Sequence, residues 1–551
     1  MAKNRLFYLP LGGAGEIGMN MYVYGYGQKG RERLLVVDAG IAFPDMETTP
    51  GIDHVMPDIA WLQERAERIE GIFLSHAHED HVGAIARIQT CLGVPVYARA
   101  FTAHLAWQKF EEMQLESDCL HVVDASPARV NAGPFSVGFL PVPHSIPEAS
   151  SLVIDCPAGR IVHTGDFKLN SSLSEEAMFS HAGWKDIRDS EILALICDST
   201  NVFVKSEGRA ESSLTAALTQ LIADSDGMVA ATTFASNITR VRQLAQAGAR
   251  AGRSVVLLGR AMLRMTSAAV DCGIVDDFPP FLAPESALGM KRHKLLLLTT
   301  GSQGELRSAS AQLSHGNFRG FRLIAGDTFL LSSKTIPGNE LSVARVVNRF
   351  ASAGIRVIDD DEGAFHVSGH ANRPDLTHLQ KLLSPRLVVP MHGEYRHLVG
   401  HAELARENGF RATVVGNGKM ADLQSGEIVG EDGVAGRTYL DGTSVISAQS
   451  GVVRDRLRMA RDGMVSVSIN FATRRREIEI AAKCKGIYTG LNGQLDEFVI
   501  DAIDDCVGRL NDSEMADEER LEREVSIAVR REISARCGKR PMVSVLLTGM
   551  S

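Results

Sequence analysis

Residues 75 to 81 of the chain are Ser75-His76-Ala77-His78-Glu79-Asp80-His81. They follow an apolar stretch, residues 71–74, that is typical of a strand, and they precede a helix that we expect to begin near Val82. Histidine and aspartate side chains placed where a strand gives way to a helix can converge on a small volume. Imidazole nitrogens and carboxylate oxygens are ligands that zinc accepts. The segment therefore predicts a metal site, with a histidine-rich polar turn as the simpler alternative.

Further candidate ligands stand at the ends of other predicted strands. His144 closes the strand expected over residues 137–142, Asp166 follows the strand at 160–163, and His392 ends the apolar run 387–391. Taken alone, each of these residues would more often be a surface or turn residue. Their joint placement at strand ends favours one shared metal site.

A glycine motif near the N-terminus suggests a different function. Residues 13–18, Gly13-Ala14-Gly15-Glu16-Ile17-Gly18, satisfy the GxGxxG pattern, and Asp38 stands about where a ribose-binding acid would stand. A dinucleotide fold requires a helix directly after the glycines, whereas residues 19–24 have the pattern of a strand. We therefore disfavour a nicotinamide site and expect a hairpin beside the metals.

The pattern of predicted elements changes along the chain. Short β-rich runs dominate up to about Cys197, whereas strands alternate with amphipathic helices beyond Asp198, as in parallel βαβ units. The strand at 387–391 resembles the first region again, so the second region is predicted to be an insertion. We expect a first domain over residues 1–207 and 369–430, an inserted α/β domain over 208–368, a linker over 431–452 and a small C-terminal α/β domain over 453–551.

The composition is that of an ordinary soluble globular protein, with 44% hydrophobic and 23% charged residues. We expect no signal peptide and no membrane-spanning segment, because no apolar run approaches the roughly 20 residues that a membrane helix needs. The eight cysteines form no CxxC pair, which fits a reduced, cytoplasmic setting. The net charge of −9 lowers the expectation of a nucleic-acid partner without removing it, because a metal site needs carboxylates of its own.

The pattern HxHxDH, a distant His, a Gly-Asp pair and a late His in Met-His-Gly-Glu resembles the ligand pattern of the metallo-β-lactamase superfamily. The resemblance implies an αβ/βα sandwich that binds two zinc ions, with manganese as the alternative metal. It implies that the first ion is held by His76, His78, His144 and Asp166. It implies that the second is held by Asp80, His81, Asp166 and His392, with Asp38 orienting the site from behind the ligands.

Two further motifs resemble the nucleic-acid-processing, β-CASP branch of that superfamily. They are Asp198, in Cys197-Asp198-Ser199-Thr200-Asn201, and His370, in His366-Val367-Ser368-Gly369-His370. Other stretches, at residues 12–20, 233–237, 300–305 and 336–340, are similar to the bacterial ribonuclease J family, and the similarity covers essentially the whole chain. Residues 202–211 match no pattern of that family.

The resemblance implies a zinc-dependent ribonuclease with 5′-to-3′ exonuclease and endonuclease activity on single-stranded RNA, acting in RNA maturation and decay. Our hypothesis is that two zinc ions lower the pKa of a bridging water, and that the hydroxide attacks a backbone phosphorus in line with the departing 3′ oxygen. Asp80 would orient this nucleophile or take its proton. His370, held protonated by Asp198, would stabilise or protonate the leaving oxygen, although a simple hydrogen-bonded pair is the alternative.

The same resemblance implies a pocket for a 5′ monophosphate. Its expected residues are His366, Val367, Ser368, Gly369 and His370 around the phosphate, with Ser236 and Asn237 at the nucleotide. A homodimer and membership of an RNA-degradation complex are further implications, and the basic run at residues 474–476 is either a solvated strand end or a contact for RNA or assembly. The rival functions are a metallohydrolase of a small ester or cyclic nucleotide and a catalytically silent RNA-binding subunit. The complete ligand set argues against a silent subunit.

Overall fold

The computed structural model describes residues 4–169, 184, 187, 191–336, 338–359, 364–429, 435–472, 477–489 and 494–549. The basic run Arg474–Arg476 therefore lies outside the described residues. The chain divides into two units, one formed by Met1–Ala42 with Met56–Gly436 and the other by Phe43–Val55 with Arg437–Ser551. Among the described residues, no helix combines the length and the apolar character needed to cross a membrane.

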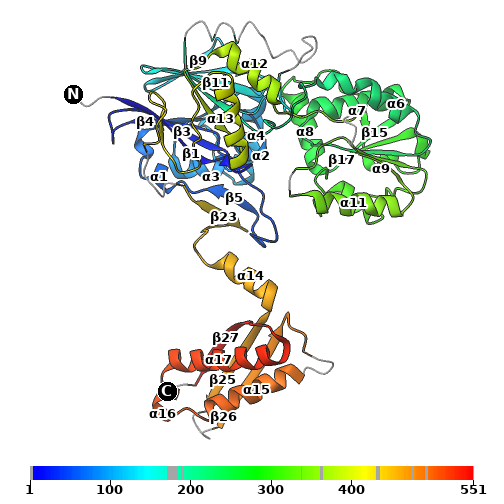
Figure 1. Ribbon diagram of the computed structural model, residues 1–551. Helices are drawn as coiled ribbons and strands as arrows, with labels where there is room; N and C mark the ends of the chain where they lie inside the picture. The colour runs from blue at the N-terminus through cyan, green and yellow to red at the C-terminus, as the bar shows by residue number, and fades with distance from the viewer. Residues whose placement is uncertain are drawn as a thin grey trace. The chain divides into compact units, whose positions relative to one another are not determined.

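The first unit contains two sheets that share a buried core (Figure 1). One sheet has the strand order β22-β1-β3-β4-β6-β7-β8, with β22 at Ala421–Asp422, β1 at Arg5–Gly12, β3 at Met21–Gly27, β4 at Arg33–Val37, β6 at Ile69–Phe73, β7 at Val96–Ala98 and β8 at Leu120–Val122. The other has the order β20-β13-β12-β11-β10-β9, with β20 at Leu387–Met391, β13 at Ile192–Asp198, β12 at Gly159–His163, β11 at Ser150–Cys156, β10 at Phe135–Pro141 and β9 at Arg129–Ala132.

Alternating burial explains this layering. Ile154 packs into the core shared by the two sheets, whereas Val153 packs on the opposite face, among side chains of α12 (Arg373–Leu383) such as Leu376 and Leu379. Side chains of a strand point alternately to the two faces of its sheet. The predicted αβ/βα sandwich is thereby confirmed.

The glycine segment forms the predicted hairpin. β1 pairs with β3 in antiparallel register, with Gly12 opposite Met21. Gly13, Gly15 and Gly18 all have positive φ angles, which glycine adopts without a steric penalty. No helix follows the glycines in this described segment, so the dinucleotide site has no helix N-terminus and is excluded.

The inserted domain is a parallel sheet covered by helices on both faces (Figure 1). Its strand order is β16-β15-β17-β14-β18-β19, with β16 at Phe281–Leu282, β15 at Ser254–Leu258, β17 at Leu295–Thr299, β14 at Val229–Thr232, β18 at Thr328–Leu331 and β19 at Arg356–Ile358. The surrounding helices include α6 (Thr215–Ala223), α7 (Ile238–Arg250), α8 (Arg260–Asp271) and α11 (Glu340–Ser352). All strand pairs recorded in this sheet are parallel, as the alternation of strands and helices predicts.

The connection between the two domains of the first unit positions the site. The chain leaves the first domain after β13 and returns to it with α12, which leads into β20. Strands β13 and β20 pair in parallel, with Asp198 opposite Met391. Residues far apart in sequence, such as Asp198 and His392, therefore stand at the same end of one sheet.

The second unit is built around a sheet of order β26-β25-β27, with β26 at Glu477–Lys485, β25 at Met464–Ala472 and β27 at Met542–Thr548. Helices α15 (Gln494–Val507) and α17 (Glu518–Cys537) contribute apolar side chains to its core. Residues 43–55 also belong to this unit, which the sequence pattern does not indicate. The Asp53 carboxylate accepts the backbone N–H of Gly442 at 2.7 Å, and Arg456 donates to the carbonyl of Gly51 at 3.1 Å.

Candidate metal centre

The candidate ligands follow strand ends in the first unit and meet at one place. His76 and His78 follow β6, His144 follows β10, and Asp166 follows β12. Among the described residues, three groups of ligand atoms lie within 4.8 Å of one another. They are His76, His78, His144 and Asp166; then Asp80, His81, Asp166 and His392; and finally Asp166, Asp198, His370 and His392.

The first group has the spacing of a metal site. His78 Nδ1 lies 3.1 Å from the Nε2 atoms of both His76 and His144, and Asp166 Oδ2 lies 3.8 and 3.7 Å from those two Nε2 atoms. Ligands about 2.0–2.1 Å from a tetrahedral zinc ion are themselves about 3.3 Å apart. Burial and neighbouring histidines lower the pKa of His76 and His144, and burial lowers the pKa of His78 to about 4. These imidazoles are therefore neutral near pH 7, as metal binding requires.

The second group shares Asp166 with the first. Asp166 Oδ2 lies 3.3 Å from His81 Nε2, and Asp80 Oδ2 lies 3.3 Å from His392 Nε2. Asp166 Oδ1 is buried and accepts no hydrogen bond from the described residues. His392 Nδ1 lies 3.4 Å from this oxygen. A buried carboxylate oxygen without a hydrogen-bond donor is costly unless a positive group of this kind or a metal ion satisfies it. The donor set and this oxygen therefore fit two metal ions that share Asp166.

The carboxylates of the second group stabilise positive charge on the imidazoles of His81 and His392. Burial alone would lower the pKa of His81 and His392, but Asp166 and the other nearby carboxylates outweigh it. The pKa of His81 lies well above its ordinary value, and that of His392 is raised to about 10. In the metal-free protein, protons supply the charge that bound metal would supply.

Hydrogen bonds determine which nitrogen of His76 and His81 faces the cluster. Ser75 donates its hydroxyl proton to Asp38 at 2.8 Å, so it accepts from His76 Nδ1 at 3.0 Å. Asp38 also accepts from His81 Nδ1 at 2.8 Å. Both histidines therefore present Nε2 to the cluster, and Asp38 lies behind them in the position expected from the sequence.

The remaining imidazoles are oriented in the same way. A carbonyl can only accept, so the 2.7 Å contact between Gly369 O and His144 Nδ1 leaves Nε2 of His144 for a metal. Thr200 donates to Asp198 at 2.7 Å and so accepts from His392 Nδ1 at 2.8 Å. His78 differs, because its Nε2 contacts Ser236 Oγ at 3.1 Å and its Nδ1 faces the cluster.

His370 and Asp198 form a close pair beside the ligands. His370 Nδ1 lies 2.8 Å from Asp198 Oδ2 and 4.0 Å from Asp166 Oδ2. Burial would lower the pKa of His370, but Asp198 and Asp166 raise it above its ordinary value. The His370 side chain is 21% exposed, unlike that of Asp198 at 1%, so it is the member of the pair that solvent and substrate can reach.

The residues expected to bind a phosphate lie around this pair, in the loop before α12. Ser368 accepts hydrogen bonds from the side chain of Asn201 at 2.8 Å and from the backbone N–H of His370 at 3.1 Å. Val367 is buried and packs into the core of the inserted domain. His366 is half-buried; burial and the positive charge of Arg240 lower its pKa to about 3.

Ser236 and Asn237 precede α7 and have different environments. Ser236 faces His78, as described above. Asn237 is buried, accepts the backbone N–H of Arg240 at 3.0 Å as the N-cap of α7, and donates to Glu211 at 3.2 Å. The structure thus brings Ser236 to the cluster, while the Asn237 side chain is engaged within the inserted domain.

Asn20 and Thr200 also contact the cluster, although no sequence motif indicates a role for either residue. Asn20 follows the glycine motif of residues 13–18, and its side-chain nitrogen lies 3.0 Å from His81 Nε2. Thr200 follows Asp198 and contacts His392. In the sequence, both residues stand beside recognised motifs, and this position is the one indication of a role. Local periodicity does not distinguish them from ordinary loop residues.

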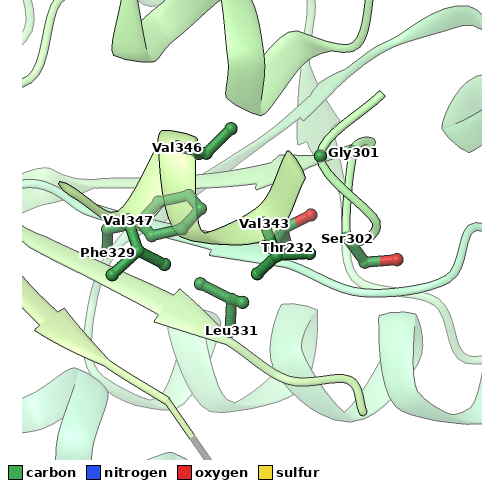
Figure 2. Close-up of a pocket in the computed structure, with 9 residues that line it drawn as sticks. Thr232, Gly301, Ser302, Phe329, Leu331, Val343, Val346 and Val347 are labelled. Atoms are coloured by element: carbon green, nitrogen blue, oxygen red, sulfur yellow. The ribbon is translucent and has the colours of Figure 1, made fainter. Parts of the chain in front are cut away.

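A separate concavity in the inserted domain carries no comparable chemistry. Figure 2 shows the residues that line it, which include Phe329, Leu331, Val343, Val347, Thr232, Gly301 and Ser302. None of its lining residues titrates near neutral pH. The histidine and aspartate cluster is the candidate site.

Comparison with known families covers both units. Residues 15–190 match the metallo-beta-lactamase superfamily model, 226–350 the ribonuclease J beta-CASP domain, 364–415 the Zn-dependent metallo-hydrolase RNA specificity domain and 451–550 the ribonuclease J C-terminal domain. The chain is 37% identical to a ribonuclease J of Sinorhizobium meliloti over 98% of this chain and 97% of that one. It is 34% identical to a ribonuclease J of Thermus thermophilus, over 84% and 81% of the two chains.

A solved structure shows the same fold at low identity. A protein of unknown function from Enterococcus faecalis superposes with a TM-score of 0.50 and 18% identity, over 78% of this chain and 100% of that chain.

Proposed function

The chain belongs to the ribonuclease J family and is a metal-dependent, hydrolytic ribonuclease, and from this premise we propose that it cleaves single-stranded RNA with two zinc ions that share Asp166. The observation that carries the proposal is the pair of ligand groups with one common carboxylate. The proposed first ligand set is His76, His78, His144 and Asp166, and the second is Asp80, His81, Asp166 and His392. Manganese remains the alternative metal.

Bound metal would acidify a water molecule and stabilise the charge that develops on the phosphorane. The protein's part is to hold the ligands rigid. Asp38 and Thr200 fix the imidazole tautomers of His81 and His392. The Asp80 carboxylate, whose side chain is 27% exposed, can orient the attacking nucleophile or take its proton.

His370 is proposed to act on the departing 3′ oxygen. Its Nδ1–H donates to Asp198 and its pKa is raised, which favours a second proton at Nε2 that the ring could give to the leaving group. Asp198 supports this role by holding positive charge on the ring.

The loop from His366 to His370 is proposed to bind the 5′ monophosphate, with Ser236 nearby. Besides burial, the charges of Arg240, Lys168 and Lys334 lower the pKa of His366, and the Glu211 carboxylate opposes them only in part. The net positive potential favours an anionic group. Such a pocket would direct 5′-to-3′ trimming, alongside internal cleavage, in RNA maturation and decay.

We further propose that the enzyme acts in the cytoplasm as a homodimer, within an RNA-degradation assembly. The matched RNA-specificity model favours RNA over a small ester or cyclic nucleotide as substrate. The complete ligand set favours an active enzyme over a silent RNA-binding subunit.

A metal-defined nuclease assay tests these proposals together. Matched RNAs with a 5′ monophosphate or a 5′ triphosphate are incubated with protein loaded with zinc or manganese. We expect hydrolysis only with metal, faster trimming of the monophosphate RNA, and no hydrolysis by folded His76→Ala or Asp80→Ala. Undiminished hydrolysis by both variants would refute the two-metal assignment, and equal rates on the two RNAs would refute the monophosphate pocket.

A further inference from the structure

Asn20 is anchored against the loop that carries Asp80. It lies directly before β3 and is fully buried. Its backbone N–H donates to the carbonyl of Asp80 at 2.9 Å, and its own carbonyl accepts from Gly40 at 2.9 Å. The backbone N–H therefore ties Asn20 to Asp80, and the backbone carbonyl ties it to Gly40.

The Asn20 side chain points at the second ligand group. Its amide nitrogen lies 3.0 Å from His81 Nε2 and 3.4 Å from Asp80 Oδ2. An amide can only donate from this nitrogen. Once the Nε2 lone pair of His81 is taken by a metal, the acceptor left for the amide is Asp80.

Tyr22 determines the orientation of the Asn20 side-chain amide. Its hydroxyl donates to Asn20 Oδ1 at 2.6 Å, so the oxygen faces Tyr22 and the nitrogen faces the ligands. Burial, with nearby carboxylates, raises the pKa of Tyr22 well above its ordinary value, so the hydroxyl remains a donor at any working pH.

The backbone at Gly13 lies close against the side chains of Asn20 and Tyr22. A Cβ atom at Gly13 would lie 2.1 Å from Asn20 Oδ1 and 2.4 Å from the Tyr22 hydroxyl. Gly13 also has a φ of +79°. The first glycine of the motif is thus required both for its turn and for the space that the Asn20 amide occupies.

We propose that Asn20, oriented by Tyr22, is a positioning residue that aims the Asp80 carboxylate at the second metal ion. The inference rests on the proposed two-metal function. Hydrogen bonds from residues behind the ligands orient carboxylate ligands, and their loss weakens metal binding roughly 10- to 100-fold. The effect is confined to the second ion, because Asn20 contacts Asp80 and His81 and none of the three histidines of the first group.

Zinc titration of the metal-free full-length chain against a competing chelator tests this inference. We expect Asn20→Ala to bind the first equivalent as the wild type does and the second roughly 10- to 100-fold more weakly. Tyr22→Phe, which keeps the ring and removes only the hydroxyl, should weaken the same second step by a smaller factor.

Tyr8→Phe is the matched control. Tyr8 stacks on Tyr22 with ring centroids 6.0 Å apart and is equally buried, but its hydroxyl has no hydrogen-bond partner among the described residues. We expect both zinc affinities to be unchanged. Equal losses in both steps for Asn20→Ala, or equal effects of Tyr8→Phe and Tyr22→Phe, would overturn the positioning role in favour of a general packing role.

Failure of the proposed function gives a different result. Wild-type protein that binds a single equivalent would overturn the two-metal centre itself. Wild-type protein with two equivalents and an Asn20→Ala variant that also binds both normally would overturn only the role of Asn20.

Discussion

The Ser236 hydroxyl lies 3.1 Å from Nε2 of His78, so a residue of the inserted domain contacts a ligand of the first domain. The other nitrogen of His78 faces His76 and His144 at 3.1 Å. A serine hydroxyl can accept as well as donate, so Ser236 can accept the Nε2–H of His78 when Nδ1 binds a metal. The inserted domain therefore contributes to the surroundings of the candidate metal centre.

Ser236→Ala should weaken zinc binding at the first group by about 10-fold, because His78 loses the hydroxyl that can accept its Nε2–H and hold the ring in place. Zinc titration against a competing chelator measures the change. Ser352→Ala, at the exposed end of α11, is the control in the same domain and should bind zinc normally. An unchanged affinity in Ser236→Ala would show that the contact does not support the ligand.

Removal of metal should abolish hydrolysis while leaving the fold intact. The core between the two sheets of the first unit is apolar and separate from the ligand atoms, as Phe135, Val137 and Phe139 illustrate. A chelator-treated sample should keep its far-ultraviolet circular dichroism and regain activity with zinc or manganese. Hydrolysis that persists in protein shown to be metal-free would contradict a metal-dependent reaction.

The ligand positions could be predicted because they follow from local rules. A strand that ends in a short loop places its next polar residue at the sheet edge, as with His144 after β10 and Asp166 after β12. The parallel pairing of β13 with β20, which brings Asp198 beside His392, required the hypothesis of an insertion. That hypothesis rests on the apolar strand at residues 387–391, whose pattern resembles the first region although it follows the second region in the chain.

The contacts between distant residues could not be predicted in this way. Asn20 and Asp80, or Ser236 and His78, meet only through tertiary packing, and periodicity carries no information about such pairs. Glu211 is a similar case. It ends a segment with no recognised pattern, and a loop glutamate is normally expected to be solvated, yet its carboxylate is buried.

Gly369→Ala should disrupt the first ligand group at His144, whereas Ser236→Ala acts at His78. An added Cβ would lie 2.6 Å from Ser145 Oγ and 2.9 Å from the His144 ring, and His144 would have to move. We expect a loss of zinc affinity of at least about 10-fold and a matching loss of activity. In Gly416→Ala, where the Cβ would come no closer than 4.0 Å to a neighbour, both should be unchanged. Normal zinc binding in Gly369→Ala would show that the loop yields without moving His144.

Glu211 joins three segments of the first unit through buried charge. Its Oε2 accepts from Arg240 at 2.8 and 2.5 Å, and its Oε1 lies 3.6 Å from Lys168 Nζ. Burial would raise the pKa of Glu211, but Arg240 and Lys168 outweigh it and hold the pKa below its ordinary value. A depressed carboxylate pKa means stability that is present above the unfolded pKa of about 4.3 and is lost as the pH falls through the folded pKa.

Glu211→Gln should therefore destabilise the inserted domain by about 3–5 kcal/mol at pH 7, because two buried cations lose their counter-charge. The loss of unfolding free energy should be the same at pH 5.5. It should shrink only below about pH 4.3, where protonation of Glu211 begins to destabilise the wild-type protein as well. Hydrogen exchange of the α7 amides measures the free energy of opening. Glu207→Gln, an exposed change in the same segment, should leave that exchange unaltered. A penalty for Glu211→Gln that stayed constant down to pH 3.5 would mean that lost packing, and not lost charge, accounts for the effect.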